Sequence, residues 1–329
     1  MAKKPAVLAL DLGGTNVRWA VVNRWGDILG RWEKATASLT EQESLIQGLA
    51  EVMLASAQEA RKKGAEIQAA GFGVPGRVLP REGLVAFSPN VPELNDCALI
   101  PSLRPLLPWP LTLENDANLF ALGEHWIGAG RGHDQMLGIT LGTGVGGGLI
   151  LNGALWQGTA GTSGEVGHIT IEPEGEKCNC GNRGCLETIA SGAWTVSWVK
   201  KELTKGASSW LRELWETDPE AIVGKTLVTA ARMRDPLALR AFERVGRGLG
   251  IAIADVVHLL GLSRVVLGGR FTRSWDYFYP HLKEELFRRL TLFPPEAVSV
   301  APAELDDDAG LLGAARLAWD AREEEKIKA

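Results

Sequence analysis

Two short segments rich in glycine and threonine, one in each half of the chain, restrict the fold most strongly. Asp11-Leu12-Gly13-Gly14-Thr15 and Leu141-Gly142-Thr143-Gly144 each interrupt a pair of apolar, strand-like segments. Glycine has no Cβ, so the backbone N–H groups of such a turn can come close to an anion. Matching anion-binding loops in both halves predict an α/β protein built from two related lobes.

Length and composition agree with a two-lobed soluble protein. A chain of 329 residues exceeds the size at which one hydrophobic core stays compact. The net charge of -5 gives no indication of nonspecific nucleic-acid binding. The apolar stretch from Ala6 to Leu10 is too short for a signal-peptide core or a membrane span. We therefore expect a cytoplasmic protein with no nucleic-acid or membrane partner.

Periodicity and turn residues predict the order of the elements. A β-hairpin is expected over residues 7–22 and a helix over 40–63, which ends at Gly64. Strands are predicted at 67–74, 111–114, 136–141, 148–151 and 264–267, and the proline-rich segment 75–110 is predicted to form loops. Further helices are expected from the capping pair Asn115-Asp116 to Glu124, over 237–260 and over 309–324.

The first glycine loop can hold a phosphate group together with magnesium. Gly13 and Gly14 leave N–H groups accessible, Thr15 and Asn16 add side-chain donors, and the Asp11 carboxylate suits hydrated Mg²⁺. The alternative interpretation is a hairpin turn with a capping aspartate.

The second loop has five glycines between positions 142 and 148, with Thr143 between Gly142 and Gly144. Neither the Gly-Lys-Ser/Thr of a Walker loop nor the helix of a dinucleotide fingerprint comes after it. The alternative, a strained turn without a ligand, does not explain why two such loops occur.

Asp116 is the candidate catalytic base. An alcohol is a poor nucleophile, and a fixed carboxylate that accepts its proton assists phosphoryl transfer. The alternative is a helix N-cap without chemistry, and both roles can hold together.

Three of the four cysteines lie within eight positions, which predicts a metal site. His168, Cys178, Cys180 and Cys185 form a Cys₃His set, the kind that binds structural Zn²⁺ with no open position for water. Buried free thiols or a redox pair are the alternatives.

These segments occur in the order seen in sugar kinases of the ROK (repressor, open reading frame, kinase) family, which the chain resembles over nearly its whole length. The shared segments are Asp11 to Asn16, Gly73-Val74-Pro75-Gly76, Ser88-Pro89-Asn90, Glu114 to Asn118, the glycines from 142 to 148, Gly158 to His168, and Cys178 to Glu187.

The resemblance implies an actin-like (ribonuclease H-like) fold, with two α/β lobes around a central cleft that close over ATP and a hexose. Residues 1–117 and the C-terminal helix 309–329 would form the small lobe, and 118–308 the large lobe with a zinc-binding segment at 168–187. Asp116 would be the base on the sugar 6-hydroxyl. Other sugar contacts are implied for Gly76, Asn90, Asn115, Glu165, His168 and Glu187, so that His168 would bind zinc through one ring nitrogen and sugar through the other. Contacts to ATP and Mg²⁺ are implied for Asp11, Gly13, Gly14, Thr15, Asn16, Gly142, Thr143, Gly144, Gly268 and Gly269.

The resemblance leaves two functional questions open. Glucose is the expected hexose, and fructose, mannose, allose and N-acetylhexosamines are alternatives; a homo-oligomer, dimer or tetramer, is also expected. The other class of function is a noncatalytic sugar-sensing regulator. Only ten residues precede Asp11, which leaves no room for a DNA-reading domain in this sequence.

Overall fold

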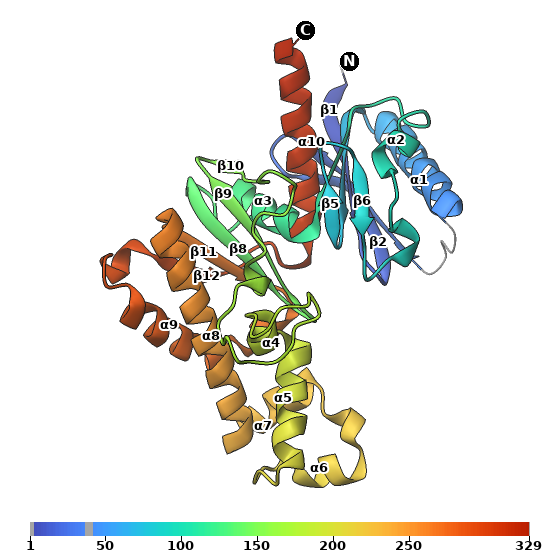
Figure 1. Cartoon of the computed structure of the whole chain (residues 1–329). Coiled ribbons are helices and arrows are strands. Elements are labelled where there is room, and N and C mark those ends of the chain that lie inside the picture. The colour runs from blue at the N-terminus through green and yellow to red at the C-terminus, as the bar shows by residue number, and fades with distance from the viewer. Residues whose placement is uncertain (1–2, 37–41, 329) are drawn as a thin grey trace. The chain divides into compact units, whose positions relative to one another are not determined.

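The computed structural model describes residues 3–36 and 42–328, which divide into two compact units (Figure 1). Unit 1 comprises residues 1–134, 148–164 and 303–329, and unit 2 comprises 135–147 and 165–302. These bounds differ from the predicted lobes, because residues 118–134, 148–164 and 303–308 group with the first unit. Among the described residues, no helix has the length and apolar character needed to cross a bilayer.

The sheet of unit 1 has the order β3-β2-β1-β4-β7. Strands β1, β2 and β3 are antiparallel neighbours, which confirms the predicted hairpin, whereas β4 and β7 run parallel to β1. The carboxyl ends of β1, β4 and β7 therefore meet at one edge of the sheet. The strands are β1 (Lys4–Leu12), β2 (Asn16–Asn23), β3 (Ile28–Ala35), β4 (Ala65–Val74) and β7 (Leu111–Asn115).

Two helices of unit 1 pack backbone to backbone and explain why α3 belongs with this unit. A Cβ atom on Gly123 of α3 would overlap the carbonyl oxygen of Ala309, and one on Gly313 of α10 would overlap that of Leu119. Helix α10 also packs against β1 and β4. The helices of unit 1 are α1 (Gln42–Lys62), α2 (Leu99–Leu103), α3 (Asp116–Ile127) and α10 (Ala309–Lys328).

Helix α1 confirms the helix predicted over 40–63 from residue 42 onward, and residue 40 lies outside the described residues. The prediction of loops alone over 75–110 was wrong. Val78 and Val85 are buried there and pair across a small two-stranded sheet, so burial overrides the turn-forming prolines. This segment contains β5 (Arg77–Leu79), β6 (Leu84–Phe87), η2 (Pro92–Leu94) and α2.

A second five-stranded sheet has the order β10-β9-β8-β11-β12, and the division between the units falls within β9. In unit 2, β11 runs parallel to both β8 and β12. The strands are β8 (Gln135–Leu141), β9 (Val145–Leu151), β10 (Ala154–Leu155), β11 (Arg264–Gly268) and β12 (Ser299–Pro302), which confirms the three strands predicted here.

The remainder of unit 2 is largely helical. Helix α8 confirms the prediction over 237–260: Asp235 caps its start by accepting the N–H of Ala238 at 2.9 Å, and Gly261 ends it with a φ of 64°. Helix α9 contains Pro280, a residue that argues against a helix in sequence. The helices are α4 (Glu187–Ala190), α5 (Gly192–Thr204), α6 (Leu211–Thr217), α7 (Gly224–Arg232), α8 (Pro236–Leu260) and α9 (Trp275–Arg289), with short 3₁₀ turns η3 (Val166–His168), η4 (Pro219–Ala221), η5 (Arg270–Ser274), η6 (Pro295–Ala297) and, in unit 1, η7 (Asp306–Asp308).

Candidate active site

The first glycine loop is a tight turn between β1 and β2. The N–H of Gly13 donates to the carbonyl oxygen of Asn16 at 2.9 Å, and the Thr36 hydroxyl donates to the carbonyl oxygen of Gly13 at 2.7 Å. Gly14 and Thr15 at its tip are exposed. The loop thus has a fixed base and an accessible tip, as an anion-binding turn requires.

Asp11 at the end of β1 is paired with Arg18 of β2. Their Oδ2 and Nη2 atoms lie 2.5 Å apart, and Arg18 also donates to the carbonyl oxygen of Asp307 at 2.9 Å. Burial raises the pKa of Asp11, while the Arg18 guanidinium acts against that shift. Sequence reasoning did not single out Arg18, although its place on the facing strand was a signal. A cation beside Asp11 would favour the ionised carboxylate further.

Asp116 is the first residue of α3, directly after β7, and Asn115 fixes this start. The Asn115 Oδ1 atom accepts the N–H groups of Ala117 at 2.8 Å and Asn118 at 3.3 Å. Its Nδ2 atom donates to the carbonyl oxygen of Gly76 at 2.8 Å. Both polar ends of Asn115 are therefore engaged within unit 1, which gives this residue a positioning role; its predicted contact with sugar stays a prediction.

The strand register brings Asp11 and Asp116 to the same edge of the sheet. Asp11 lies opposite Gly73 of β4, and Gly73 lies opposite Glu114 of β7. Two strand spacings separate β1 from β7, which is about 10 Å in the sheet plane. Asp116 comes two residues after Glu114, so a carboxylate stands at each side of the β4 end.

Asn90 lies against the first glycine loop, and Gly76 accepts a bond from Asn115, the residue before Asp116. A Cβ atom on Gly14 would stand 2.9 Å from the carbonyl oxygen of Asn90, so the loop tip and Asn90 are in close contact. Gly76 has a φ of 106°, and a Cβ there would overlap the carbonyl oxygen of Phe87. Only glycine fits this turn. The predicted sugar contacts of this unit thus gather around the first glycine loop and Asp116.

Glu114 is a further site residue that the sequence reasoning did not assign. It is buried, and its carboxylate accepts the Asn115 N–H at 2.8 Å, the Asn118 Nδ2 at 2.9 Å and the Gln157 Nε2 at 2.5 Å. Burial raises its pKa, and these three donors act against that shift. An acidic residue at the end of a buried strand was the available signal. Glu114 ties the loop after β10 to the start of α3.

In unit 2, the second glycine loop is braced by residues far along the chain. The Gly192 N–H donates to the carbonyl oxygen of Gly142 at 2.8 Å, and the Val145 N–H donates to the Glu187 Oε2 atom at 3.0 Å. A Cβ atom on Gly144 would stand 2.6 Å from the same Oε2 atom. Glu187 therefore supports the loop directly. Thr143 at the tip is exposed.

The strand end Gly268-Gly269 lies against the same loop. Gly269 has a φ of 88°, and a Cβ there would overlap the carbonyl oxygen of Leu141. This close approach explains the glycine in physical terms and places the end of β11 beside the end of β8.

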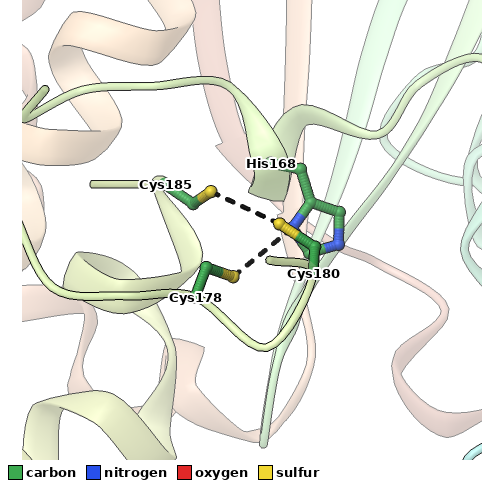
Figure 2. Close-up of side chains that lie close together, drawn as sticks. All are labelled: His168, Cys178, Cys180 and Cys185. Atoms are coloured by element: carbon green, nitrogen blue, oxygen red, sulfur yellow. Dashed lines mark hydrogen bonds between the residues drawn. The ribbon is translucent and has the colours of Figure 1, made fainter. Parts of the chain in front are cut away.

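The four predicted zinc ligands converge in unit 2, as Figure 2 shows. Their ligand atoms all lie within 4.8 Å of one another. The Cys180 and Cys185 sulfur atoms are 3.7 Å apart, and the Cys178 sulfur is 3.8 Å from the His168 Nδ1 atom. A tetrahedron with Zn–S bonds of about 2.3 Å has edges of about 3.8 Å. The set therefore has the spacing of a zinc site.

The pKa values of these thiols are shifted in different directions: burial raises that of Cys178, whereas a hydrogen bond from the Asn182 backbone lowers that of Cys180. Burial, with smaller contributions from Cys180 and Cys178, raises the pKa of Cys185 to about 12. Such a thiol keeps its proton at neutral pH unless a cation replaces it. Zn²⁺ binds thiolates and would supply that cation.

His168 faces the cysteines through Nδ1, which leaves Nε2 for another partner. The backbone N–H of His168 donates to the carbonyl oxygen of Glu165 at 3.0 Å within η3. The Glu187 Oε1 atom is 3.8 Å from the Cys178 sulfur. The Cys₃His set thus lies next to the segment that carries Glu165, His168 and Glu187.

The family profile named ROK matches residues 7–321 of the chain. The chain belongs to the ROK family. It is 36% identical over 314 residues to a glucokinase of Thermotoga maritima, and the aligned stretch covers 95% of this chain and 97% of that protein. A regulator of the same family, the DNA-binding transcriptional dual regulator NagC of Escherichia coli, is 31% identical over 242 residues, which are 74% of this chain and 58% of the regulator.

Solved structures of ROK proteins share the architecture. The ROK hexokinase of Thermus thermophilus aligns with a TM-score of 0.83 at 31% identity, over 97% of this chain and 99% of that one. A ROK glucokinase of Streptomyces griseus, crystallised with glucose and AMPPNP, aligns with a TM-score of 0.74 at 33% identity, over 96% of this chain and 99% of that one. The predicted actin-like α/β fold of this ROK protein is thereby confirmed.

Proposed function

We propose that this ROK protein is an ATP-dependent hexose kinase that transfers the γ-phosphoryl group to the 6-hydroxyl of glucose. Its glucokinase relatives and ROK kinase structural neighbours support the general class, a sugar kinase. The choice of glucose and of its 6-hydroxyl is the proposal. The observation that carries the proposal is that Asp11 and Asp116 follow the carboxyl ends of β1 and β7, two strand spacings or about 10 Å apart in the sheet, on either side of β4. In the proposed reaction the γ-phosphoryl group and the attacking hydroxyl lie between these two carboxylates.

Each residue of this pair has a separate part in the reaction. Asp116 accepts the proton of the sugar hydroxyl while the oxygen forms a bond to the γ-phosphorus and the bond to the β,γ-bridging oxygen breaks. The released group is ADP. Asp11 is placed to hold hydrated Mg²⁺, which when bound neutralises charge on the phosphates. Gly13, Gly14 and Thr15 offer N–H groups to the phosphates.

Sugar recognition in this proposal uses the residues that the ROK resemblance implies. Gly76, Asn90, Glu165, His168 and Glu187 would satisfy the sugar hydroxyls one by one. A buried hydroxyl without a partner costs free energy, so such a set discriminates between hexoses. The Glu187 Oε2 atom already accepts the Val145 N–H. Only the other lone pairs of this carboxylate are therefore available to a sugar hydroxyl.

We also propose a structural Zn²⁺ held by His168 Nδ1 and the sulfur atoms of Cys178, Cys180 and Cys185. The set has four ligands and thus no open position, so the ion would order this segment rather than act on the substrate. Zinc on Nδ1 would fix the His168 tautomer and leave an Nε2–H for a sugar oxygen. A cytoplasmic homo-oligomer, dimer or tetramer, completes the proposal.

The second candidate, a sugar-responsive regulator without catalysis, is favoured by the match to the Escherichia coli regulator. One experiment separates the two. Release of ADP should be measured by a coupled assay with ATP, Mg²⁺ and each of glucose, mannose, fructose, allose and N-acetylglucosamine. Turnover with glucose above the others supports the proposal; turnover highest with another hexose changes only the substrate. Sugar binding without ADP release for any of them refutes the kinase.

A further inference from the structure

A cavity of about 200 Å³ in unit 1 lies away from the site described above. It opens where β1 and β4 begin and where β2 ends, and α10 forms one wall. Its lining includes four charged residues and two neutral ones: Arg24, Arg316, Arg322 and Glu323, with Gln68 and Trp319. We call it the arginine pocket.

Arg322 is a partly buried guanidinium of this pocket whose hydrogen-bond partner within the described residues is neutral. It is half-buried, and its Nε and Nη2 atoms donate to one neutral acceptor, the Gln68 Oε1 atom, at 3.3 and 3.2 Å. Among the described residues it makes no ion pair with a carboxylate. A guanidinium removed from water without a counter-ion is unfavourable, so this geometry favours an added anion.

The other two arginines of the pocket differ in whether they form an ion pair. Arg316 forms a two-point ion pair with Asp320, with contacts of 2.6 and 3.2 Å. Arg24 makes no ion pair within the described part of the chain and only stacks on Trp25. Three arginines line the pocket, and the Glu323 carboxylate and the Asp320 partner of Arg316 oppose them, so one positive charge remains in a protein of net charge -5.

Trp319 makes one wall of the pocket rigid. It is buried, and its indole N–H donates to the carbonyl oxygen of Asn23 at 3.1 Å, just before Arg24. This bond joins α10 to the end of β2. The guanidinium groups of Arg24 and Arg322 therefore extend from elements that are fixed to each other.

The arginine pocket is distinct from the candidate active site. Asp11 is at the opposite end of β1 from Pro5, a pocket residue, and six residues of strand span about 20 Å. Along α10, the distance from Gly310, which lies beside Asp11, to Arg322 is about 18 Å. A ligand in the pocket would not compete with phosphates at the glycine loop.

We propose that the arginine pocket binds the phosphoryl group of a small phosphate compound. The surplus positive charge of the lining favours an anion, and phosphate oxygens accept the forked N–H pairs of guanidinium groups such as those of Arg24 and Arg322. A water molecule fills about 30 Å³, so the cavity has room for a phosphate and several waters. The hexose phosphate that the proposed kinase would release carries such a group. Naming this product as a ligand of the arginine pocket rests on the proposed function.

The test is calorimetric titration of the full chain. The candidate active site is first saturated with glucose, Mg²⁺ and AMPPNP, whose own binding is measured separately, and inorganic phosphate is then titrated. We expect one phosphate per chain. R24Q and R322Q should each weaken it about tenfold or more, because each removes a charge-assisted contact. E323Q removes the opposing carboxylate and should strengthen binding.

R232Q is the matched control, because Arg232 is an exposed arginine on α7 outside the pocket, and it should leave the affinity unchanged. The gain in E323Q cannot arise from a damaged fold, so it keeps the test informative if R322Q unfolds. No phosphate binding by the wild type, or equal binding by R322Q and E323Q, overturns the proposal. Glucose 6-phosphate binding tenfold tighter than phosphate would identify a sugar phosphate as the ligand; equal affinities would identify the phosphoryl group alone.

Discussion

Replacing Asn115 with alanine tests whether the helix cap positions the proposed base. The substitution removes two bonds at the start of α3, to the N–H groups of Ala117 and Asn118, and one bond to the carbonyl oxygen of Gly76. Loss of an N-cap costs about 1 kcal/mol. A lost bond to a half-buried carbonyl costs about 1 kcal/mol more. We expect the free energy of unfolding to fall by roughly 2 kcal/mol, which leaves an ordinary domain folded.

The kinetic effect of Asn115→Ala should be larger than this loss of stability suggests. Asp116 comes directly after the cap, and a displacement of about 1 Å in a catalytic group can cost about 100-fold in rate. We expect kcat to fall by about 10- to 100-fold, with a smaller change in the KM for glucose. Urea unfolding gives the stability, and the coupled ADP assay gives kcat and KM.

Asn115→Ser is the matched control, since serine keeps a capping oxygen but lacks the donor to Gly76. It should retain more of the stability and more of the rate than alanine does. The positioning argument is refuted if Asn115→Ala loses stability but keeps a normal kcat. A large rise in the KM for glucose at unchanged kcat would instead show that Asn115 contacts the sugar, as the sequence resemblance implies.

Further predictions concern the base, the metal and the loop contact. Asp116→Asn should bind glucose nearly as the wild type does in calorimetry but lose turnover by about 100-fold or more; near-normal turnover would contradict the assignment. Cys180→Ser should lower both the zinc content found by elemental analysis and the affinity for glucose. Because Cys185 must release a proton from a thiol of pKa about 12, zinc affinity should rise with pH, and a pH-independent affinity would exclude thiolate ligation. Gly14→Ala should raise the KM for ATP about tenfold, since its Cβ would crowd Asn90 at 2.9 Å; an unchanged KM for ATP would show that the loop tip does not hold the nucleotide.

Much of the fold could be predicted from the sequence. The hairpin of β1 and β2, helix α8 and strands β8 and β11 obey local patterns of apolar residues and capping residues. Helix α9, with Pro280 inside it, could not be predicted in this way, because packing against α8 outweighs the cost of a proline. The hairpin of β5 and β6 was missed for a similar reason, since burial of Val78 and Val85 decides it.

In the candidate site, too, contacts between residues close in the chain could be predicted, and contacts between distant residues could not. The spacing of Cys178, Cys180 and Cys185 predicted the convergence that Figure 2 shows, because these residues are close in the chain. The bond between Glu114 and Gln157 spans 43 positions and was not predicted. No local pattern indicates which distant amide will reach a buried carboxylate.

The sequence alone determined the kinds of group this protein can use: two glycine turns, a capped Asp116 and a Cys₃His set. These depend on residue types at short spacing, where sterics and hydrogen bonding act between neighbours in the chain. Only the tertiary structure decided which groups meet, such as Gly14 with Asn90, Asp11 with Arg18, and Arg24 with Arg322 around one cavity. Such contacts depend on strand register and helix packing, which the whole core sets together.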